Sequence, residues 1–560
     1  MASEWLVMKL GGTSVARRAH WENIVVRIGE ALAERRRVLV VHSALAGTTD
    51  RLVELIAADA NARRHIVDQL TVRHYTLARE LGVAEGAGLD LRLDELRAMV
   101  SALPLSRIIV PAERARLLAM GERLLSELAL PFLRARGLPV RGVDARELLT
   151  VRTRPGAHPS ARFLAATCEA MPDAAFASRL RSLPPLVLTQ GFFARDEEGR
   201  TVLLGRGGSD VSAACLAAKL SSAELEIWTD VPGLFSADPN RLASARLLRE
   251  LDYDEALEIA ANGGRVLHPR CIPPLRRAAI PLTIRYTPRP GVAGTSIRAD
   301  SPAGAEGLKA VCMRRHIAVI TLDTLEMWRR AGFLADVFAC FKHRDLSVDM
   351  VATSETRVTV SLDWAVNPDI ERRLEALRND LCGLARVEVK TDCAAVSLVG
   401  KRIRSNLGEI APLLEIFEGR RVHLLSQASN DLNITFVVDD GEASNLVEAL
   451  HAAFIKQAAG RIFGPSWKAL IEPEASRKTA PPWWQTRRDE LLELAHARSP
   501  RYVYDAATIG TRAETLRGAA IADRLFYAVK ANDQADVLRV LYELGLGFEC
   551  VSLGELEHVL

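Results

Sequence analysis

Short apolar runs alternate with segments of helical spacing through the first 300 residues. Runs typical of buried strands lie at residues 5–8, 37–42, 139–143, 186–193 and 225–228. Helical spacing occurs at residues 21–32, 113–136 and 211–219, and residues 51–102 have the pattern of an inserted helical hairpin. This alternation predicts an α/β domain over residues 1–300, an open, mostly parallel sheet with helices on both faces. In such sheets ligands bind in the loops at the carboxyl ends of the strands.

The pattern changes between residues 310 and 470. Strand-like runs at 317–322, 358–362, 394–399, 422–425 and 432–438 are separated by helical segments at 332–343, 407–417 and 443–454. Two similar βαββαβ units in tandem form a weak internal repeat. We therefore expect two small α+β domains, over residues 310–388 and 389–470.

Prolines, tryptophans and charges break the pattern in residues 471–500, which we interpret as a linker containing a helix at 487–496. Residues 501–560 then predict a strand at 500–505, a helix at 506–520, a strand at 524–529 and a helix at 535–544. Their order is similar to that of the opening units of a (β/α)8 barrel, a fold that needs about 250 residues. We expect the sequence to be part of a longer chain.

Composition narrows the class of protein. Apolar residues make up 49% of the 560 residues, and 73 Lys and Arg nearly balance 70 Asp and Glu, for a net charge of +3. This balance argues against a nucleic-acid-coating protein. The eight cysteines are scattered without a CxxC pair, so we expect reduced thiols and no protein-held metal. No apolar run is long enough to span a bilayer and no secretion signal is found, so we expect a cytoplasmic enzyme that does not bind membranes.

Two loops share one design of strand, glycine pair, hydroxyl and helix: Gly11-Gly12-Thr13-Ser14 and Gly207-Gly208-Ser209-Asp210. Glycines let a phosphate approach bare backbone N–H groups, and Ser14 is placed either to cap a helix or to bond a phosphate oxygen. Lys9 and Arg206 supply cations beside these loops, as phosphoryl transfer requires. No GxxxxGK[ST] motif is found, and residues 343–346 (HRDL) lack the asparagine of the protein-kinase loop, because residue 350 is Met.

An ordered set of motifs resembles the aspartate kinases of the amino-acid-kinase superfamily over roughly the first 465 residues: residues 9–14 (KLGGTS), 120–122 (MGE), 205–210 (GRGGSD) and 229–233 (TDVPG). The resemblance implies transfer of the γ-phosphate of ATP, with its Mg²⁺, to the β-carboxylate of L-aspartate. It makes Lys9 and Asp210 catalytic. The substrate-binding set is Ser43, Thr49, Glu122 and Arg206, and the nucleotide-binding set is Gly11, Gly12, Ser14, Thr229, Asp230, Phe235, Arg241 and Arg265.

Two residues depart from the family pattern. Arg265 stands where relatives usually have a lysine that touches ATP, and Phe235 where an aromatic hydroxyl is common. We expect the charge at residue 265 to be kept and one nucleotide hydrogen bond at residue 235 to be lost.

Residues 310–470 resemble the paired ACT domains of aspartate kinases, in the lysine-sensing version. The resemblance implies an amino-acid effector held by Met327, Phe333, Leu334, Asp349 and Ser354. A carboxylate such as Asp349 suits a cationic effector, although threonine stays open as an alternative to lysine. ACT pairing implies a homodimer.

The last 60 residues resemble the start of diaminopimelate decarboxylases, which have a barrel dependent on pyridoxal 5′-phosphate (PLP). The run FYAVKAN at residues 526–532 ends a strand on Lys530, placed to form a Schiff base. The resemblance implies a fusion of an aspartate kinase with a decarboxylase that makes L-lysine from meso-diaminopimelate.

Two alternatives stay open at this point. One is another amino-acid kinase, acting on glutamate or a carbamate, and the other is an inactive kinase fold that senses amino acids. The tandem ACT units and residues 206–210 (RGGSD) argue against the first alternative, and intact Lys9, Glu122 and Asp210 argue against the second.

Overall fold

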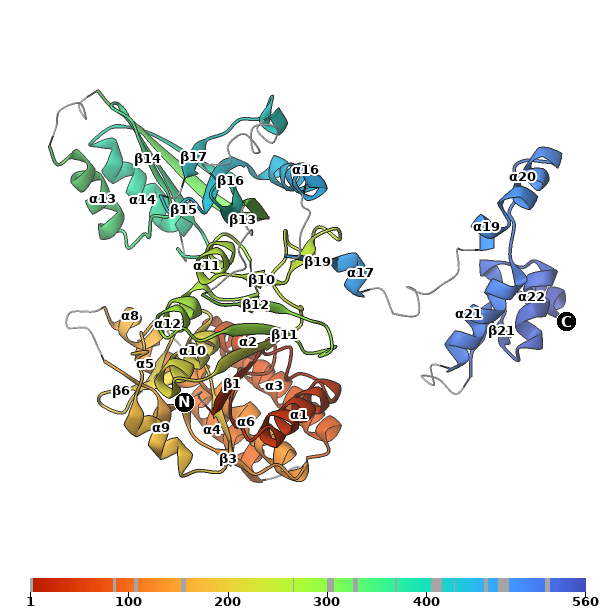
Figure 1. The fold of residues 1–560 in the computed structure, drawn as a ribbon, viewed down its shortest axis with the longest axis horizontal. Helices are drawn as coiled ribbons and strands as arrows, with labels where there is room; N and C mark the ends of the chain where they lie inside the picture. The colour runs from red at the N-terminus through yellow and green to blue at the C-terminus, as the bar shows by residue number, and fades with distance from the viewer. Residues whose placement is uncertain are drawn as a thin grey trace. The chain divides into compact units, whose positions relative to one another are not determined.

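The computed structural model describes residues 4–83, 87–104, 109–152, 158–264, 266–299, 307–325, 331–367, 370–403, 415–427, 429–457, 462–471, 483–518 and 524–560. The chain divides into two compact units, Met1–Leu470 and Ile471–Leu560 (Figure 1). Each unit is built around its own strands.

An eight-stranded sheet forms the centre of the N-terminal region. Its order is β10 (Glu250–Leu251), β12 (Thr295–Ile297), β11 (Leu282–Tyr286), β8 (Glu224–Thr229), β1 (Trp5–Leu10), β2 (Arg37–His42), β5 (Leu186–Gln190) and β3 (Val140–Gly142). Neighbouring strands run parallel except β11 and β12. The mostly parallel α/β sheet is the one the sequence pattern predicts.

Helices and small sheets surround these strands. The helices are α1 (Arg18–Ala33), α2 (Thr48–Ala57), α3 (Ala60–Leu81), α4 (Ala87–Ser101), α5 (Pro111–Leu118), α6 (Met120–Ala135), α7 (Ala145–Leu148), α8 (Pro159–Leu164), α9 (Ala174–Arg181), α10 (Gly208–Leu220), α11 (Tyr253–Ala261), η1 (Pro269–Cys271) and α12 (Ile272–Arg277). The small sheets join β4 (Thr150–Val151), β6 (Phe193–Asp196) and β7 (Thr201–Leu203), and β9 (Arg246–Leu248) with β19 (Phe463–Ser466). One long helix over residues 113–136 was expected, but a turn at Ala119 divides it into α5 and α6, a break that helical spacing alone does not reveal.

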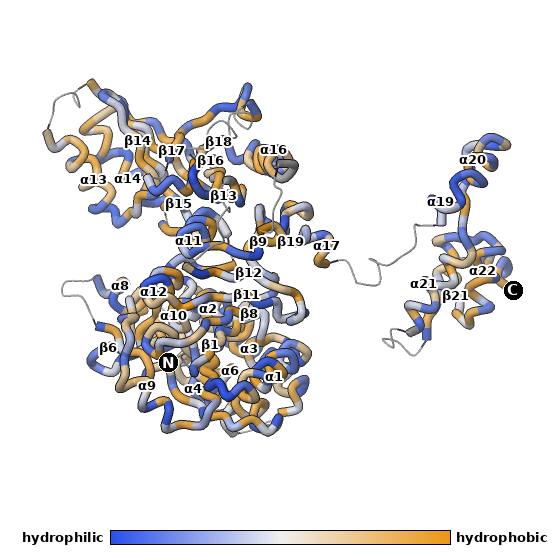
Figure 2. The backbone as a smooth tube through the Cα atoms, in the orientation of Figure 1, coloured by the Kyte–Doolittle hydropathy of each residue, from blue (hydrophilic) through white to orange (hydrophobic). Residues whose placement is uncertain are grey.

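The core lies where the strand pattern placed it. Trp5, Trp21 and Trp228 are fully or almost fully buried around β1 and β8. Figure 2 shows the hydrophobic colour gathered along the interior strands. Strand β1 has β2 on one side and β8 on the other, so the strand order reverses there, and such a switch point is where open α/β sheets bind ligands.

We call residues 307–471 the regulatory region, after the ACT domains that they resemble, and its main sheet is one continuous six-stranded sheet rather than two separate ones. Its order is β14 (Val351–Thr353), β15 (Arg357–Asp363), β13 (Gly307–Asp323), β16 (Arg386–Lys401), β18 (Asn433–Asp439) and β17 (Leu424–Gln427). The long strands β13 and β16 pair along almost their whole lengths. The first half of β13 therefore joins the strands of the second ACT unit, although it stands at the start of the first unit in sequence. Local periodicity could not reveal this nesting, because the pairing is long-range.

The helices of this region are α13 (Phe333–His343), α14 (Ile370–Cys382), η2 (Glu415–Phe417), α16 (Asp440–Gln457) and α17 (Trp467–Ile471). The expected helices at 332–343 and 443–454 are confirmed. Most of the one expected at 407–417 lies outside the described residues, and only η2 is described there.

The C-terminal unit contains α19 (Trp483–Thr486), α20 (Arg488–Ala497), α21 (Ala506–Gly518), β20 (Phe526–Ala528), η3 (Val529–Ala531), α22 (Ala535–Glu543), β21 (Gly547–Glu549) and α23 (Leu553–Val559). The strand expected at 500–505 is wrong: the segment pairs with no strand in the described part of the chain, and Tyr502 is 92% exposed. An apolar run without a partner strand does not become a strand. Across all described residues, no helix combines the length and apolarity that a bilayer crossing requires.

Candidate active site

A lysine–carboxylate pair links the two glycine loops at the switch point. Lys9, near the end of β1, places Nζ 2.7 Å from Oδ1 of Asp210 in the first turn of α10. Both side chains are almost buried, at 12% and 10% exposure, so the pair is well shielded from water. The first glycine loop (residues 11–14) and the second glycine loop (residues 207–210), almost 200 positions apart, thus meet beside one another.

Close backbone packing explains the glycine at residue 12. A Cβ there would lie 2.9 Å from the Ala44 carbonyl oxygen and 3.2 Å from the Ala46 backbone, in the loop after β2. The Ala46 N–H donates to the Gly12 carbonyl at 3.2 Å, and the Ser43 N–H donates to the Leu10 carbonyl at 3.0 Å. The loop after β2, which carries Ser43 and leads to Thr49 in α2, is therefore joined directly to the first glycine loop.

Ser14 has a structural partner set. Its hydroxyl donates to the Trp228 carbonyl at 3.0 Å and lies 2.6 Å from the Thr287 hydroxyl, and the residue is fully buried. The cap interpretation of Ser14 is wrong, because α1 begins at Arg18 and Arg17 occupies the N-cap position. Ser14 instead ties the end of β1 to β8 and to the segment after β11.

The second glycine loop is shaped by His268, which the sequence did not single out. Gly207 has a φ of 65°, and a Cβ there would lie 2.2 Å from the His268 ring. The His268 backbone N–H donates to Oδ2 of Asp210 at 3.3 Å, so the carboxylate is held by the lysine on one oxygen and by this amide on the other. Burial lowers the pKa of His268 despite the nearby Asp210 carboxylate, which favours a neutral ring. No local motif marks this role, because it depends on a contact across 58 residues.

Glu122 is a buried carboxylate beside the first glycine loop. It stands in the first turn of α6 at 3% exposure, and its Oε1 accepts the Ala44 N–H at 3.1 Å. Burial raises the pKa of Glu122 to about 8. Oε2 is buried without a hydrogen-bond partner among the described residues. A buried acceptor without a partner suits a cationic ligand such as an ammonium group.

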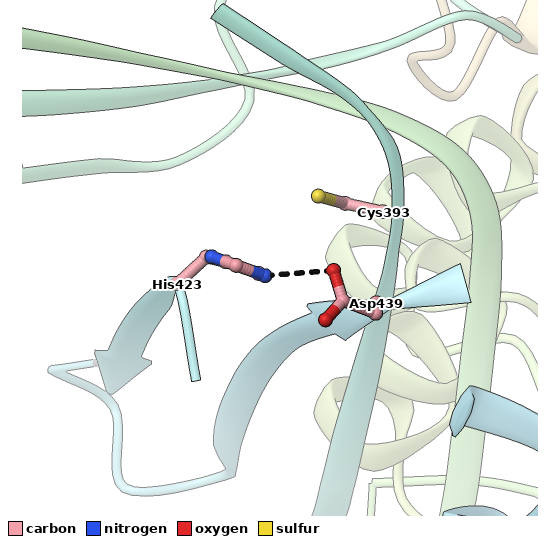
Figure 3. A group of neighbouring side chains, drawn as sticks. All are labelled: Cys393, His423 and Asp439. Atoms are coloured by element: carbon pink, nitrogen blue, oxygen red, sulfur yellow. Dashed lines mark hydrogen bonds and ion pairs between the residues drawn. The ribbon is translucent and has the colours of Figure 1, made fainter. Parts of the chain in front are cut away.

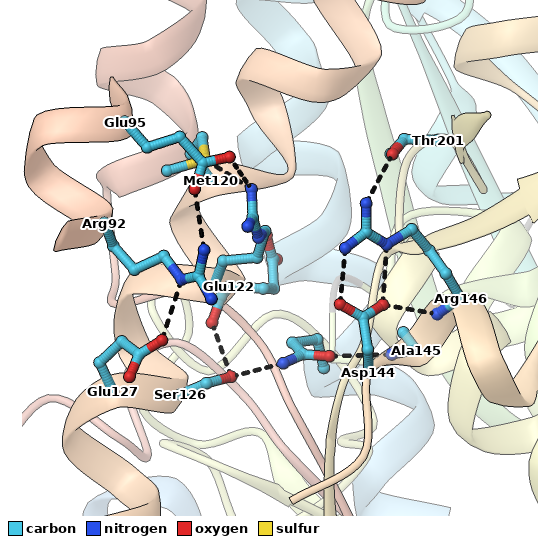
Figure 4. Close-up of polar contacts among 12 residues, drawn as sticks. Arg92, Glu95, Met120, Glu122, Ser126, Glu127, Asp144, Ala145, Arg146 and Thr201 are labelled. Carbon is cyan, nitrogen blue, oxygen red and sulfur yellow. Dashed lines mark hydrogen bonds and ion pairs between the residues drawn. The ribbon is translucent and has the colours of Figure 1, made fainter. Parts of the chain in front are cut away.

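Polar contacts hold the helix that carries Glu122 (Figure 4). One turn along, the Ser126 hydroxyl donates to the Glu122 carbonyl at 3.2 Å and accepts from Gln190 at 2.8 Å. Nearby, Glu95 accepts from Arg92 at 2.9 Å and from Arg123 at 2.6 Å. These bonds fix α6, so Glu122 is held in place by its surroundings.

A cavity of about 390 Å³ lies beyond the carboxyl end of β8. Four of the predicted nucleotide residues line it, namely Thr229, Asp230, Phe235 and Arg241. The Phe235 ring is 5% exposed and meets Trp467 edge-on at 5.7 Å. Arg265 lies outside the described residues, although its neighbours Gly264 and Val266 line the cavity. The regulatory region completes the wall with residues the sequence did not single out: Val311, Cys312, Met313 and Arg315 of β13 and Val447 of α16.

Arg206 directly precedes the second glycine loop, but its side chain contacts the regulatory region. Its side chain is exposed and donates to the Ala365 carbonyl at 3.2 Å, in the first ACT unit.

The predicted effector residues do not form one cavity. Met327 lies outside the described residues, and Phe333, at 1% exposure, belongs to the core of the first ACT unit. Leu334 is 41% exposed and Ser354 sits in a turn with its N–H on the Arg357 carbonyl. Asp349 is paired with Arg314 at 2.8 Å. None of these described residues lines the 560 Å³ cavity of this unit, which is bordered by Ser347, Val348 and Asn367 among others.

Three possible metal-ligand side chains gather on the regulatory sheet, Cys393, His423 and Asp439 (Figure 3). Nε2 of His423 lies 3.0 Å from Oδ1 of Asp439, and Lys390 Nζ lies 2.7 Å from that same oxygen. Burial raises the pKa of the Cys393 thiol to about 11, which disfavours the thiolate that a metal needs. The Lys390 ammonium already pairs with the Asp439 carboxylate that a metal would need, and we assign no metal to this group.

Lys530 lies in η3, directly after β20, as expected for the end of a strand. Its side chain is exposed, and β20 pairs with β21 in a two-stranded sheet. The described residues of this unit do not enclose a cofactor around Lys530.

A mostly parallel sheet whose switch point holds two glycine loops, a buried lysine–aspartate pair and an adjoining cavity defines an α/β enzyme of the small-molecule kinase class. Residues 4–286 match the amino acid kinase family, residues 396–454 match an ACT domain, and residues 506–560 match the pyridoxal-binding domain of pyridoxal-dependent decarboxylases.

Curated relatives narrow this class. The chain is 30% identical over 462 residues to lysine-sensitive aspartokinase 3 of Escherichia coli, covering 80% of this chain and 99% of the relative. It is also 30% identical over 465 residues to the chloroplastic aspartokinase 3 of Arabidopsis thaliana, covering 80% and 81%. The chain therefore belongs to the amino acid kinase family, among its aspartokinases.

Solved structures agree with this assignment. The E. coli aspartokinase III complex with aspartate and ADP, described as R-state, matches with a TM-score of 0.70 and 29% identity over 80% of this chain and 99% of that one. The lysine and aspartate complex of the same enzyme, described as T-state, matches with a TM-score of 0.63 and 30% identity over the same shares. The fold with its ACT region is thus that of aspartokinases.

Proposed function

We propose that the chain transfers the γ-phosphoryl group of ATP to the β-carboxylate of L-aspartate, giving 4-phospho-L-aspartate. The observation that carries the proposal is the Lys9–Asp210 pair, which joins two glycine loops at the switch point of the sheet. The aspartokinase relatives, one of them solved with aspartate and ADP, support the choice of substrates.

The chemistry needs charge stabilisation more than it needs a strong base. A carboxylate oxygen of aspartate attacks the γ-phosphorus, and the bond to the bridging oxygen of ADP breaks as the new O–P bond forms. The Lys9 ammonium would neutralise charge on the transferring group, and Asp210 would hold Lys9 in position. The Gly11 and Gly208 N–H groups already donate to the Trp228 and Gly205 carbonyls, so other backbone N–H groups of the two glycine loops, such as that of Gly12, would donate to phosphate oxygens. Mg²⁺ would arrive with ATP and supply further positive charge to the phosphates.

Selection of aspartate would come from groups of opposite charge. Glu122 would pair with the ammonium of aspartate through the buried oxygen that lacks a partner. Arg206 would grip a carboxylate with its planar guanidinium, and Ser43 and Thr49 would add hydroxyl contacts. Because Glu122 is protonated below its raised pKa, binding of the ammonium would draw a proton off the carboxyl group.

The nucleotide would occupy the 390 Å³ cavity lined by Thr229, Asp230, Phe235 and Arg241, with Arg265 beside it. Ser14 would support the first glycine loop rather than bind the nucleotide, because its hydroxyl already bonds to the Trp228 carbonyl and the Thr287 hydroxyl.

Regulation and the second activity extend the proposal. We infer that lysine is the effector of the ACT region, with Asp349 as its cation partner, and that two copies pair through these domains. The match to a pyridoxal-binding domain at residues 506–560 supports a fused meso-diaminopimelate decarboxylase that produces L-lysine. If one chain catalyses both the first step and the step that forms lysine, feedback of lysine on the kinase would control the supply of its own precursor.

A coupled assay of ADP release tests the kinase proposal, with aspartate and glutamate supplied separately and in competition. We expect ADP release with aspartate. Glutamate should neither support ADP release by itself nor inhibit the reaction with aspartate. Preference for glutamate or a carbamate would replace the substrate, and absence of ADP release with every acceptor would favour an inactive sensor. Addition of L-lysine to the same assay tests regulation, because an effector must bind two states with different affinities.

A further inference from the structure

Arg206, in the loop before α10, reaches the turn that follows β15 in the regulatory region. Its Nη1 donates to the Ala365 carbonyl at 3.2 Å, although the two residues are 159 positions apart. A neutral carbonyl takes one of five N–H donors and leaves the positive charge intact. The contact therefore orients the guanidinium and still leaves it able to bind a carboxylate.

A short turn over residues 363–367 holds that carbonyl in place. Oδ1 of Asp363 accepts the Ala365 N–H at 2.7 Å, and the Asp363 carbonyl accepts the Asn367 N–H at 3.1 Å. The Asn367 side chain is 2% exposed, accepts the Ser347 N–H at 2.7 Å and donates to the Ser347 carbonyl at 2.9 Å. The direction of the Ala365 carbonyl is thus set by a fully bonded turn.

Arg314 of β13 ties this turn to a second carboxylate. Its Nη1 lies 3.1 Å from Oδ2 of Asp363, and its Nη2 lies 2.8 Å from Oδ2 of Asp349. Arg314 is 16% exposed and Asp363 is 8% exposed. Charge-assisted bonds shielded in this way hold their geometry better than surface ion pairs.

We propose that the turn at residues 363–367 is a positioning element for the substrate carboxylate: its Ala365 carbonyl orients Arg206, and Arg314 sets the turn by bridging Asp363 and Asp349. The inference rests on the proposed function, in which Arg206 binds aspartate. It also gives regulation a physical route, because a cationic ligand at Asp349 would compete with Arg314 for the same oxygen.

Kinetics of the full chain separate positioning from general damage. Arg314→Gln is expected to raise the KM for aspartate about threefold to tenfold, with the KM for ATP within about twofold, since one oriented hydrogen bond is loosened. Arg314→Lys should restore part of this loss. Arg344→Gln, which breaks an ion pair with Asp380 elsewhere in the same ACT unit, is the matched control and should leave both constants unchanged. Thermal melting checks that each variant is folded.

A double variant tests the connection itself. In an Arg206→Lys background, adding Arg314→Gln should raise the aspartate KM little further, because the group being positioned is already altered. Independent, multiplicative effects would overturn the positioning role, as would equal rises in both KM values for Arg314→Gln alone. If Arg206→Lys leaves the aspartate KM unchanged, the proposed substrate role of Arg206 fails, and the positioning role fails with it. If Arg206→Lys raises that KM while Arg314→Gln does not, only the positioning role fails.

Discussion

The two glycine loops have nearly the same sequence but different structures. In the second loop, α10 begins at Gly208, so the start of the helix and the Asp210 carboxylate lie together at the site. In the first loop, α1 begins only at Arg18, and Ser14 is buried against Trp228 and Thr287. A glycine pair followed by a hydroxyl therefore fixes a close approach of backbone in both loops. Whether the hydroxyl faces a ligand depends on where the next helix begins.

Lys9→Ala should have the largest effect, because it removes the cation that both loops share. We expect a loss of at least about 3 kcal/mol of transition-state stabilisation, roughly a hundredfold or more in kcat, the order seen when one preorganised electrostatic group is removed. The coupled assay with aspartate measures it. Arg51→Ala, on the exposed side of α2, is the control and should keep normal turnover. Near-normal kcat in Lys9→Ala would exclude the role given to Lys9.

Glu122→Gln tests the buried carboxyl group beside the first glycine loop through the pH dependence of the free energy of unfolding. The pKa of Glu122 is about 8 in the folded protein against an ordinary 4.5, so the folded state keeps a proton that the unfolded state loses. The stability contributed by the protonated carboxyl is complete below pH 4.5 and is lost as the pH rises through 8.

Urea unfolding of wild type and Glu122→Gln at several pH values measures this difference. The variant should lack the fall in the free energy of unfolding over that pH range, and Glu54→Gln, an exposed carboxylate on α2, should keep it. Parallel curves for wild type and Glu122→Gln would contradict the raised pKa.

Gly207→Ala examines the second loop. The new Cβ would lie 2.2 Å from the His268 ring at a φ of 65°. We expect a loss of about 1–3 kcal/mol in the free energy of unfolding and lower kcat, because His268 also holds Asp210. Gly199→Ala is a matched control, since Gly199 has a φ of 80° and no atom of the described residues would lie within 4 Å of its Cβ. If the two variants lose equal stability, backbone strain alone explains Gly207, and the contact with His268 is unimportant.

Sequence reasoning was strongest where a motif is local. The strands of the kinase sheet and both glycine loops are runs of contiguous residues, and Lys9 and Asp210 each stand beside or within one of these loops. It failed where the partner is remote: the structural use of Ser14 depends on Thr287, the geometry of Asp210 on His268, and the position of Arg206 on Ala365. The nested regulatory strands were missed for the same reason, because β13 pairs with a strand about 80 residues later.

The smallest effect is expected for Ser14→Ala. This variant tests whether the hydroxyl of the first glycine loop is structural or binds a phosphate. Removing the hydroxyl leaves the Thr287 hydroxyl buried without its partner at 2.6 Å, whereas the Trp228 carbonyl still accepts the Gly11 N–H at 3.0 Å. We expect a loss of about 1–2 kcal/mol in the free energy of unfolding, and kcat and the KM for ATP within about twofold of wild type. Urea unfolding and the coupled assay measure the two quantities.

A second substitution makes this prediction sharper. The double variant Ser14→Ala with Thr287→Val removes both polar groups. Its loss in the free energy of unfolding should therefore be smaller than the sum of the losses of the two single variants. If Ser14→Ala instead raises the KM for ATP strongly while stability holds, the serine contacts a phosphate. The two glycine loops would then work alike, despite the different starting points of their helices.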